Sequence, residues 1–169
     1  MGGFLDAPIK DKNSEPGHNE HFQWGACGMQ GWRTGMEDTH ICEEVTIDGG
    51  YGMLFGVFDG HGGRETAEYA KANFKKVFIS NAKFKEGDYE KALVQTFMKL
   101  DDEIKDNDDT ADTGCTACVV LITNTKIYCA NAGDSRAIIC QGGNNAFPLS
   151  EDHKPNNANE SKRIRAAGH

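Results

Sequence analysis

Residues 51–63, with the sequence YGMLFGVFDGHGG, join a compact apolar run to a polar turn rich in glycine. The apolar part, Tyr51 to Phe58, favours a buried β-strand, and the turn sequence Asp-Gly-Gly at residues 48–50 precedes it. Asp59 directly follows the predicted strand, so we expect its carboxylate at the edge of a sheet, within reach of a ligand. The glycines that follow let the backbone turn sharply and bring a carbonyl close to an ion. The same residues also fit an ordinary strand-to-helix turn in which Asp59 caps the helix.

Regular elements are predicted on both sides of this stretch. Two strands precede it, at Phe22–Gln30 and Thr39–Ile47, the second rich in β-branched residues. The helical spacing of apolar residues predicts two helices between residues 67 and 104. Three strands and a further helix follow, at Thr116–Ile122, Lys126–Ala130, Arg136–Cys140 and Asn159–Ala167. This order of elements predicts an α+β fold in which helices pack on antiparallel sheets.

The composition of the chain excludes several classes of partner. Its 169 residues carry 18 basic and 26 acidic side chains, a formal net charge of −8. Neither a nucleic-acid backbone nor an anionic membrane surface favours an acidic protein, so neither is expected as the main partner. No apolar run reaches the length of a transmembrane helix, and the first twenty residues are too polar for a signal peptide. We therefore expect an intracellular protein, in the cytoplasm or the nucleus, without stable membrane insertion.

The N-terminal segment, residues 1–20, has no apolar periodicity and is predicted to be an arm that precedes a single domain at residues 21–169. Its first residues resemble a myristoylation site at Gly2, although Asp6 stands where Ser or Thr is preferred. One myristoyl chain would anchor the protein only weakly. The sequence does not indicate an oligomeric state.

The six cysteines do not indicate disulfides or zinc. Cys115 and Cys118 form a lone CxxC, without the second CxxC or the following His pair of zinc sites. Most of the cysteines fall in apolar, strand-like runs, where cysteine packs as a small hydrophobic residue.

Two further polar clusters occur at predicted strand ends or turns. Arg33 precedes the adjacent carboxylates Glu37 and Asp38. A guanidinium can bind a phosphate through two hydrogen bonds, and carboxylates and carbonyls suit Mg²⁺ or Mn²⁺. Asp134 follows another predicted strand, in the sequence NAGDSR. By themselves, the first cluster also fits a solvated group of ion pairs, and the second fits a structural Asx turn.

Five segments, in the same order, resemble the motifs of the type 2C protein phosphatases, a metal-dependent family. They are MQGWR with MED (within residues 29–38), FGVFDGHGG (55–63), GCTA (114–117), NAGDSR (131–136) and LSEDHKP (149–155). The resemblance runs from the first residue to the last. It implies a sandwich of two antiparallel β-sheets flanked by helices, in α-β-β-α layers. The implied activity is hydrolysis of phosphoserine and phosphothreonine in phosphoprotein substrates by a metal-activated water.

The resemblance also implies which residues bind metal. Asp59 would bridge two Mg²⁺ or Mn²⁺ ions, and the carbonyl of Gly60 would bind one of them. Glu37 and Asp38 would support the metals largely through bound water.

The remaining implied roles concern the substrate and a third metal. Arg33 would bind the substrate phosphate, and His61 would act as the general acid. Asp134, with Thr116 nearby, would lie beside a third, weaker metal position.

The chain departs from the family pattern at its C-terminal end. The family's domain is longer, and nothing here matches the later motifs that supply two further metal-binding aspartates. We therefore expect a fold that is incomplete at the C-terminus and a 169-residue stretch that is inactive or impaired by itself. Three interpretations follow: a fragment of a longer phosphatase, a truncated relative that serves as a binding or structural module, alone or completed by another chain, or an active half-enzyme.

Overall fold

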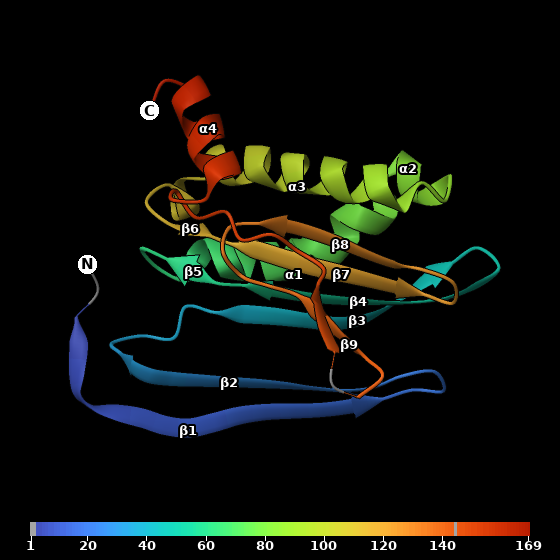
Figure 1. The fold of residues 1–169 in the computed structure, drawn as a ribbon, viewed down its shortest axis with the longest axis horizontal. Helices are drawn as coiled ribbons and strands as arrows, with labels where there is room; N and C mark the ends of the chain where they lie inside the picture. The colour runs from blue at the N-terminus through green and yellow to red at the C-terminus, as the bar shows by residue number, and fades with distance from the viewer. Residues whose placement is uncertain (1–2, 144) are drawn as a thin grey trace.

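A computed structural model describes residues 3–143 and 145–169 (Figure 1). Its strands are β1 Phe4–His18, β2 Gln23–Arg33, β3 Thr39–Ile47, β4 Gly50–Phe58, β5 Gly60–His61, β6 Gly114–Cys115, β7 Ala117–Thr123, β8 Ile127–Ala132, β9 Ile138–Gln141 and β10 Asn145–Pro148. Its helices are α1 Glu65–Ser80, α2 Ala82–Lys85, α3 Tyr89–Lys105, the 3-10 helix η1 Asp108–Thr110, and α4 Ala158–Ala166. The myristoylation site expected at Gly2 lies outside the described residues.

The centre of the fold is a four-stranded antiparallel sheet with the order β3-β4-β7-β8. Because side chains alternate across a strand, Leu54 and Phe58 of β4 face one side of this sheet and Tyr51 and Phe55 face the other. Helices α1 and α3 lie on the first side (Figure 1). Strand β4 is therefore an inner strand with contacts on both faces, which explains why its sequence is almost entirely apolar.

The helix layer is held to the sheet by a cluster of aromatic side chains. Phe74 of α1 is 1% exposed, and its ring centroid lies 5.8 Å from that of Phe58 on β4 and 5.6 Å from that of Phe97 on α3. These contacts join three elements at one point. They bury the apolar stripes from which both helices were predicted.

The segment predicted as an N-terminal arm, residues 1–20, contains strand β1 over most of its length. Strand β1 pairs antiparallel with β2, and its register continues without a shift from Lys12 to His18. Most of its side chains are exposed, so no apolar periodicity marks it in the sequence. The pairing of β1 with β2 is made by backbone N–H and C=O groups, which a polar segment has as well as an apolar one. The boundary at residue 21 stays a prediction.

Aromatic contacts connect the β1–β2 ribbon to the second side of the central sheet. The rings of Trp24 and Phe55 meet edge to face with centroids 6.3 Å apart, and His21 stacks on Tyr51 at 3.7 Å. The α+β class with helices packed on antiparallel sheets is therefore confirmed. In the described residues, the second layer on this side is the two-stranded ribbon.

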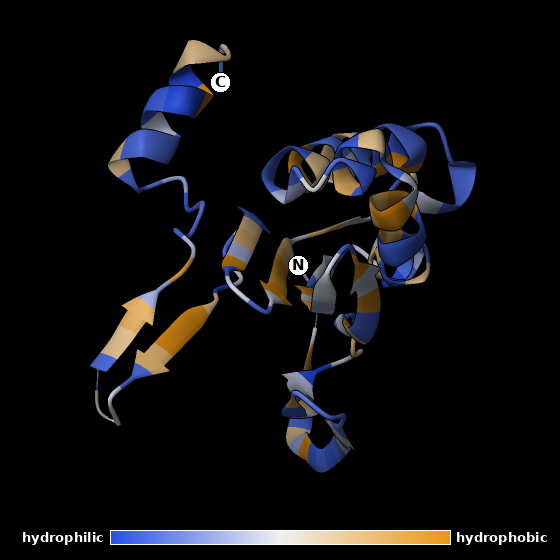
Figure 2. Ribbon diagram, turned by 90° about the vertical axis from the view of Figure 1, so that its right-hand side faces the viewer, coloured by the Kyte–Doolittle hydropathy of each residue, from blue (hydrophilic) through white to orange (hydrophobic). Residues whose placement is uncertain are grey.

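The C-terminal part forms a separate group of elements. Figure 2 shows the β9–β10 hairpin and α4 on the side of the molecule opposite to the helix pair. The strand predicted at Arg136–Cys140 is observed as β9, which begins two residues later and ends one residue later. The short elements α2, β5, β6 and β10 were not predicted, since segments of two to four residues carry no periodicity. Among the described helices, none is long and apolar enough to cross a membrane.

Candidate metal and phosphate site

Asp59 lies at the end of β4, where backbone bonds connect it to Thr116. The Asp59 amide donates to the Thr116 hydroxyl at 3.2 Å, and the Thr116 amide donates to the Asp59 carbonyl at 2.9 Å. The Thr116 hydroxyl lies 2.6 Å from the hydroxyl of Ser135. Three of the segments identified in the sequence, around residues 59, 116 and 135, therefore meet at one end of the sheet.

The carboxylates of Asp38 and Asp59 lie close together. Burial raises the pKa of Asp38, and the charge of Asp59 and a side-chain hydrogen bond with it raise that pKa further. The Arg33 guanidinium acts in the opposite direction, while the charge of Glu37 adds to the increase. These four residues therefore share one electrostatic environment, although their segments are up to 26 positions apart in the sequence.

Gly60 permits a close approach between this strand end and the segment of Glu37. A Cβ atom at position 60 would lie 2.6 Å from the Glu37 carbonyl oxygen. This distance is too short for any side chain at that position unless the backbone moves. Gly62 has φ +74°, and a Cβ there would meet the Asp112 carbonyl oxygen at 2.8 Å. The glycines of this turn are thus required by packing and by a backbone conformation that other residues rarely adopt.

His61 is exposed beside this site. Strand β5 pairs with β6, which places His61 opposite Gly114, and the imidazole ring covers the space that a Gly114 side chain would fill. Cys115 follows in β6. Burial, with a smaller contribution from the charge of Asp59, raises the pKa of its thiol to about 11. Cys115 is therefore a neutral neighbour of the carboxylates.

Asp134 is not brought into the same group. Its carboxylate is exposed, and no hydrogen bond or ion pair joins it to Asp38 or Asp59 in the described part of the chain. Across residues 3–143 and 145–169, no three His, Cys, Asp or Glu side chains gather closely enough to hold a metal ion. The structure therefore brings together Arg33, Asp38 and Asp59, with Asp134 linked only through its neighbour Ser135.

Asp152 is a buried carboxylate to which the sequence analysis gave no role. It is 8% exposed and accepts from Arg136 Nε at 2.8 Å and from Arg136 Nη2 at 2.7 Å, while Lys154 Nζ lies 3.1 Å away. These hydrogen bonds, with the Arg136 bonds dominant, lower its pKa to about 2. The ion pair fixes the turn that carries Asp134. The one signal for Asp152 in the sequence was its position within LSEDHKP, a segment that resembles a family motif.

The residues at the strand end fit a divalent cation. The charge of Asp59 raises the pKa of Asp38, and a hard cation would neutralise the negative charge that these two carboxylates bring together. The fold and this carboxylate pair therefore define an α+β protein with a candidate metal centre at one end of its central sheet.

The comparisons with known proteins agree with this definition. Residues 22–169 match the family model described as "Protein phosphatase 2C". The chain is 41% identical to "Probable protein phosphatase 2C 5" of Paramecium tetraurelia, with 99% of this chain and 60% of that protein covered. It is 43% identical to "Protein phosphatase 2C homolog 3" of Schizosaccharomyces pombe, with 99% of this chain and 42% of that protein covered. The chain thus belongs to the protein phosphatase 2C family.

A solved structure supports the fold. It is described as "Structure of a C.elegans sex determining protein" and matches with a TM-score of 0.69 and 18% sequence identity over 99% of this chain and 39% of the other. At this identity the match concerns the fold alone. The chain spans about 60% of the length of the Paramecium relatives.

Proposed function

We propose that the chain belongs to a Mg²⁺- or Mn²⁺-dependent protein phosphatase that hydrolyses phosphoserine and phosphothreonine in intracellular phosphoproteins. One observation carries the proposal: Arg33, Asp38 and Asp59 share one electrostatic environment at the end of the central sheet. Carboxylates paired with a guanidinium provide what a metal-bound phosphate requires. Membership of the protein phosphatase 2C family supports the same reaction.

Asp59, Asp38 and the Gly60 carbonyl would hold two divalent cations, with Glu37 as a further support and Asp134 beside a third, weaker position. When bound, such cations lower the pKa of a water ligand and neutralise charge on a phosphate. Thr116 keeps Asp59 in place through two hydrogen bonds, one from the Asp59 amide to the Thr116 hydroxyl and one from the Thr116 amide to the Asp59 carbonyl.

The substrate would be held and protonated by two other side chains. Arg33 is exposed at the end of β2 and would bind the phosphate through two hydrogen bonds. His61 is exposed beside the same strand end and would donate a proton to the departing serine or threonine oxygen. General acid catalysis of this kind is worth roughly 10²- to 10⁴-fold in rate.

The test is turnover of a phosphothreonine peptide with Mn²⁺ and with EDTA, by this chain and by a form extended past residue 169. The extended form should turn over the peptide in Mn²⁺ and lose this activity in EDTA, whereas the 169-residue chain alone should be inactive or impaired. Asp59→Asn should inactivate the extended form. Asp48→Asn changes a carboxylate in the exposed β3–β4 turn and serves as the control that keeps full activity. His61→Ala should lower kcat with little change in KM. Metal-independent turnover by the purified protein would refute the proposal.

The alternative is a truncated, catalytically impaired relative that acts as a binding or structural module, with or without a second chain. One observation favours it: the described residues contain no group of three metal-binding side chains. Calorimetry separates the two functions. A folded 169-residue chain that binds no Mn²⁺ and gains no activity on extension would support the module.

A further inference from the structure

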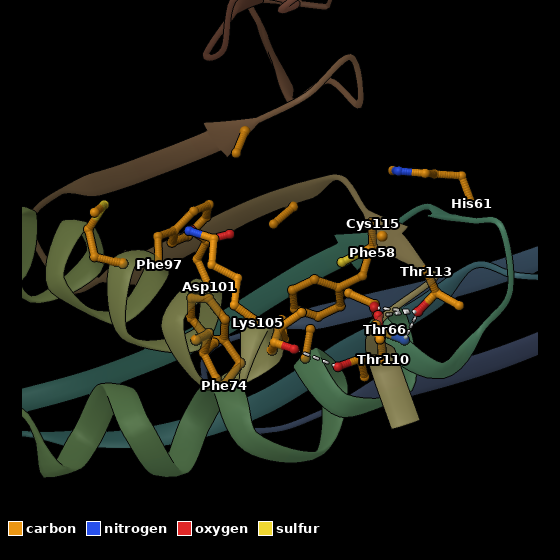
Figure 3. A pocket seen from close by; sticks show the side chains of 18 residues that line it. Phe58, His61, Thr66, Phe74, Phe97, Asp101, Lys105, Thr110, Thr113 and Cys115 are labelled. Atoms are coloured by element: carbon orange, nitrogen blue, oxygen red, sulfur yellow. Dashed lines mark hydrogen bonds and ion pairs between the residues drawn. The ribbon is translucent and has the colours of Figure 1, made fainter. Parts of the chain in front are cut away.

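A cavity of about 660 Å³ lies between helices α1 and α3 and the end of the central sheet (Figure 3). Its inner wall includes Phe58, Phe74, Phe97 and Leu100. Met98 also lines the cavity and is 60% exposed, so the cavity reaches the surface of α3. The volume falls in the range of sites that bind small molecules or single side chains of a partner.

The polar groups around the cavity already have partners. The hydroxyls of Thr66 and Thr113 lie 2.6 Å apart, and the Thr110 hydroxyl donates to the Ile104 carbonyl at 2.7 Å. Lys105 Nζ donates to a carboxylate oxygen of Asp101, one turn earlier on α3. An occupant would therefore gain free energy from apolar contacts with the wall and find few open hydrogen-bonding groups. This favours a large, uncharged apolar group.

The cavity adjoins the candidate metal site. His61 and Cys115 line it, and in Figure 3 both lie at the end away from Phe97. His61 is exposed, so the cavity has a second opening there, besides the one at Met98. Cys115 is also close enough to Asp59 for that charge to raise the pKa of its thiol. A chain bound with its phosphate at Arg33 and Asp59 would have its neighbouring residues beside this opening.

We propose that the cavity receives a large apolar side chain of the phosphoprotein substrate, from a residue close in sequence to the phosphorylated one. The inference rests on the proposed function and adds a substrate class to it: phosphopeptides with a leucine-like or aromatic residue near the phosphoserine or phosphothreonine. The apolar wall provides affinity, and the position of the opening beside His61 sets the spacing between the two residues.

Photo-crosslinking tests the location without requiring turnover. The probes are peptides in which a non-hydrolysable phosphonate replaces the phosphothreonine and one photo-leucine occupies each flanking position in turn. One position should crosslink to Phe97 or Met98, two apolar residues of α3 that line the cavity. Crosslinks only outside the cavity, or equal labelling by free photo-leucine, would overturn the assignment; the second result would indicate a site for any small apolar molecule.

Matched variants on α3 test the specificity. Met98→Asp places a charge at the opening, whereas Val94→Asp places one a turn earlier, at 62% exposure and outside this cavity. Met98→Asp should remove the crosslink and raise KM about tenfold for the phosphothreonine peptide with leucine at the crosslinking position. A serine version of the peptide and p-nitrophenyl phosphate should be unaffected. Val94→Asp should change none of these values.

Ala70→Leu gives a second, uncharged test, because it fills the cavity from α1. It should remove the crosslink as well. In the wild type, equal KM values for the leucine and serine peptides would overturn the inference while leaving the proposed function intact. No Mn²⁺-dependent turnover of any substrate would refute the proposed function, and the crosslinks would then still decide whether a peptide side chain occupies the cavity.

Discussion

Asp38 and Asp59 are held near each other by the fold although both carry negative charge. The pKa of Asp38 is raised above its ordinary value of 3.8 by burial and by Asp59. The folded chain therefore retains a proton that the unfolded chain has already released. The contribution of this group to stability falls as pH rises from 3.8 through the raised pKa, and at neutral pH the repulsion is fully present.

Asp38→Asn should therefore stabilise the metal-free chain at pH 7, by less than about 1 kcal/mol because the site is partly solvated. The gain should shrink as pH falls toward 3.8, where the wild-type carboxyl is protonated. Urea unfolding at several pH values measures both effects. Asp11→Asn, on the exposed side of β1, is the control without an effect. In Mn²⁺ the wild type should be more stable than Asp38→Asn, since the wild type alone keeps both carboxylates for the metal. If Asp38→Asn were less stable than the wild type without metal, the repulsion between the two carboxylates would not be the cause.

Single residues of the site were predictable to different degrees. Asp59 was placed correctly at a strand end, because a turn of glycines follows an apolar run. The closeness of Asp38 and Asp59 followed only from the family resemblance. Asp152 was missed, because its partner Arg136 is 16 positions away and no local pattern pairs them.

At the scale of elements, the turn after β8 and the segment before α4 act as one unit. The His153 amide donates to the Gly133 carbonyl at 2.9 Å, and the Leu149 amide donates to the Ala137 carbonyl at 2.9 Å. The Asp152 ion pair with Arg136 lies beside both bonds. Because the pKa of Asp152 is about 2, its stabilising effect is complete above pH 3.8 and is lost as pH falls toward 2.

Asp152→Asn should loosen this unit without unfolding the domain. The amides of Leu149 and His153 should exchange about tenfold faster at neutral pH, because the two basic side chains lose their counter-charge. Hydrogen exchange followed by mass spectrometry or NMR measures the change. Glu160→Gln removes a carboxylate that pairs with Arg163 within α4 and should leave both amides unchanged. Equal exchange in wild type and Asp152→Asn would show that the ion pair does not hold the unit.

Elements with a clear apolar period were predicted well, and the others were not. The strand predicted at Thr39–Ile47 has the bounds of β3, and the apolar stripes of α1 and α3 fall within one helix each. Strand β1 escaped prediction because its side chains mostly face solvent. Its position depends on the free edge of β2, which is a property of the assembled fold.

For the whole molecule, stability depends on the layer of helices staying on the sheet. Phe74 contacts rings from the sheet, from α3 and from its own helix, where its centroid lies 6.3 Å from that of Phe78. The side chain is 1% exposed. Its removal would leave a void that three elements would have to close together.

Phe74→Ala should lower the free energy of unfolding by about 3–5 kcal/mol, the usual cost of a buried phenylalanine. Ile79→Ala, at 39% exposure on the outer side of α1, should cost less than about 1 kcal/mol. Chemical denaturation followed by far-ultraviolet circular dichroism compares the two. Equal losses would mean that the aromatic cluster is not the junction between the layers.

Gly114, which lies beneath the imidazole ring of His61, is a position worth comparing among related sequences. Any larger residue at position 114 would displace that ring, because the two occupy the same space. Among relatives of this chain, a bulky substitution there should accompany loss of the proton donation that we propose for the histidine, even where the histidine itself is present. One position of an alignment could then separate active enzymes from pseudoenzymes before any protein is purified.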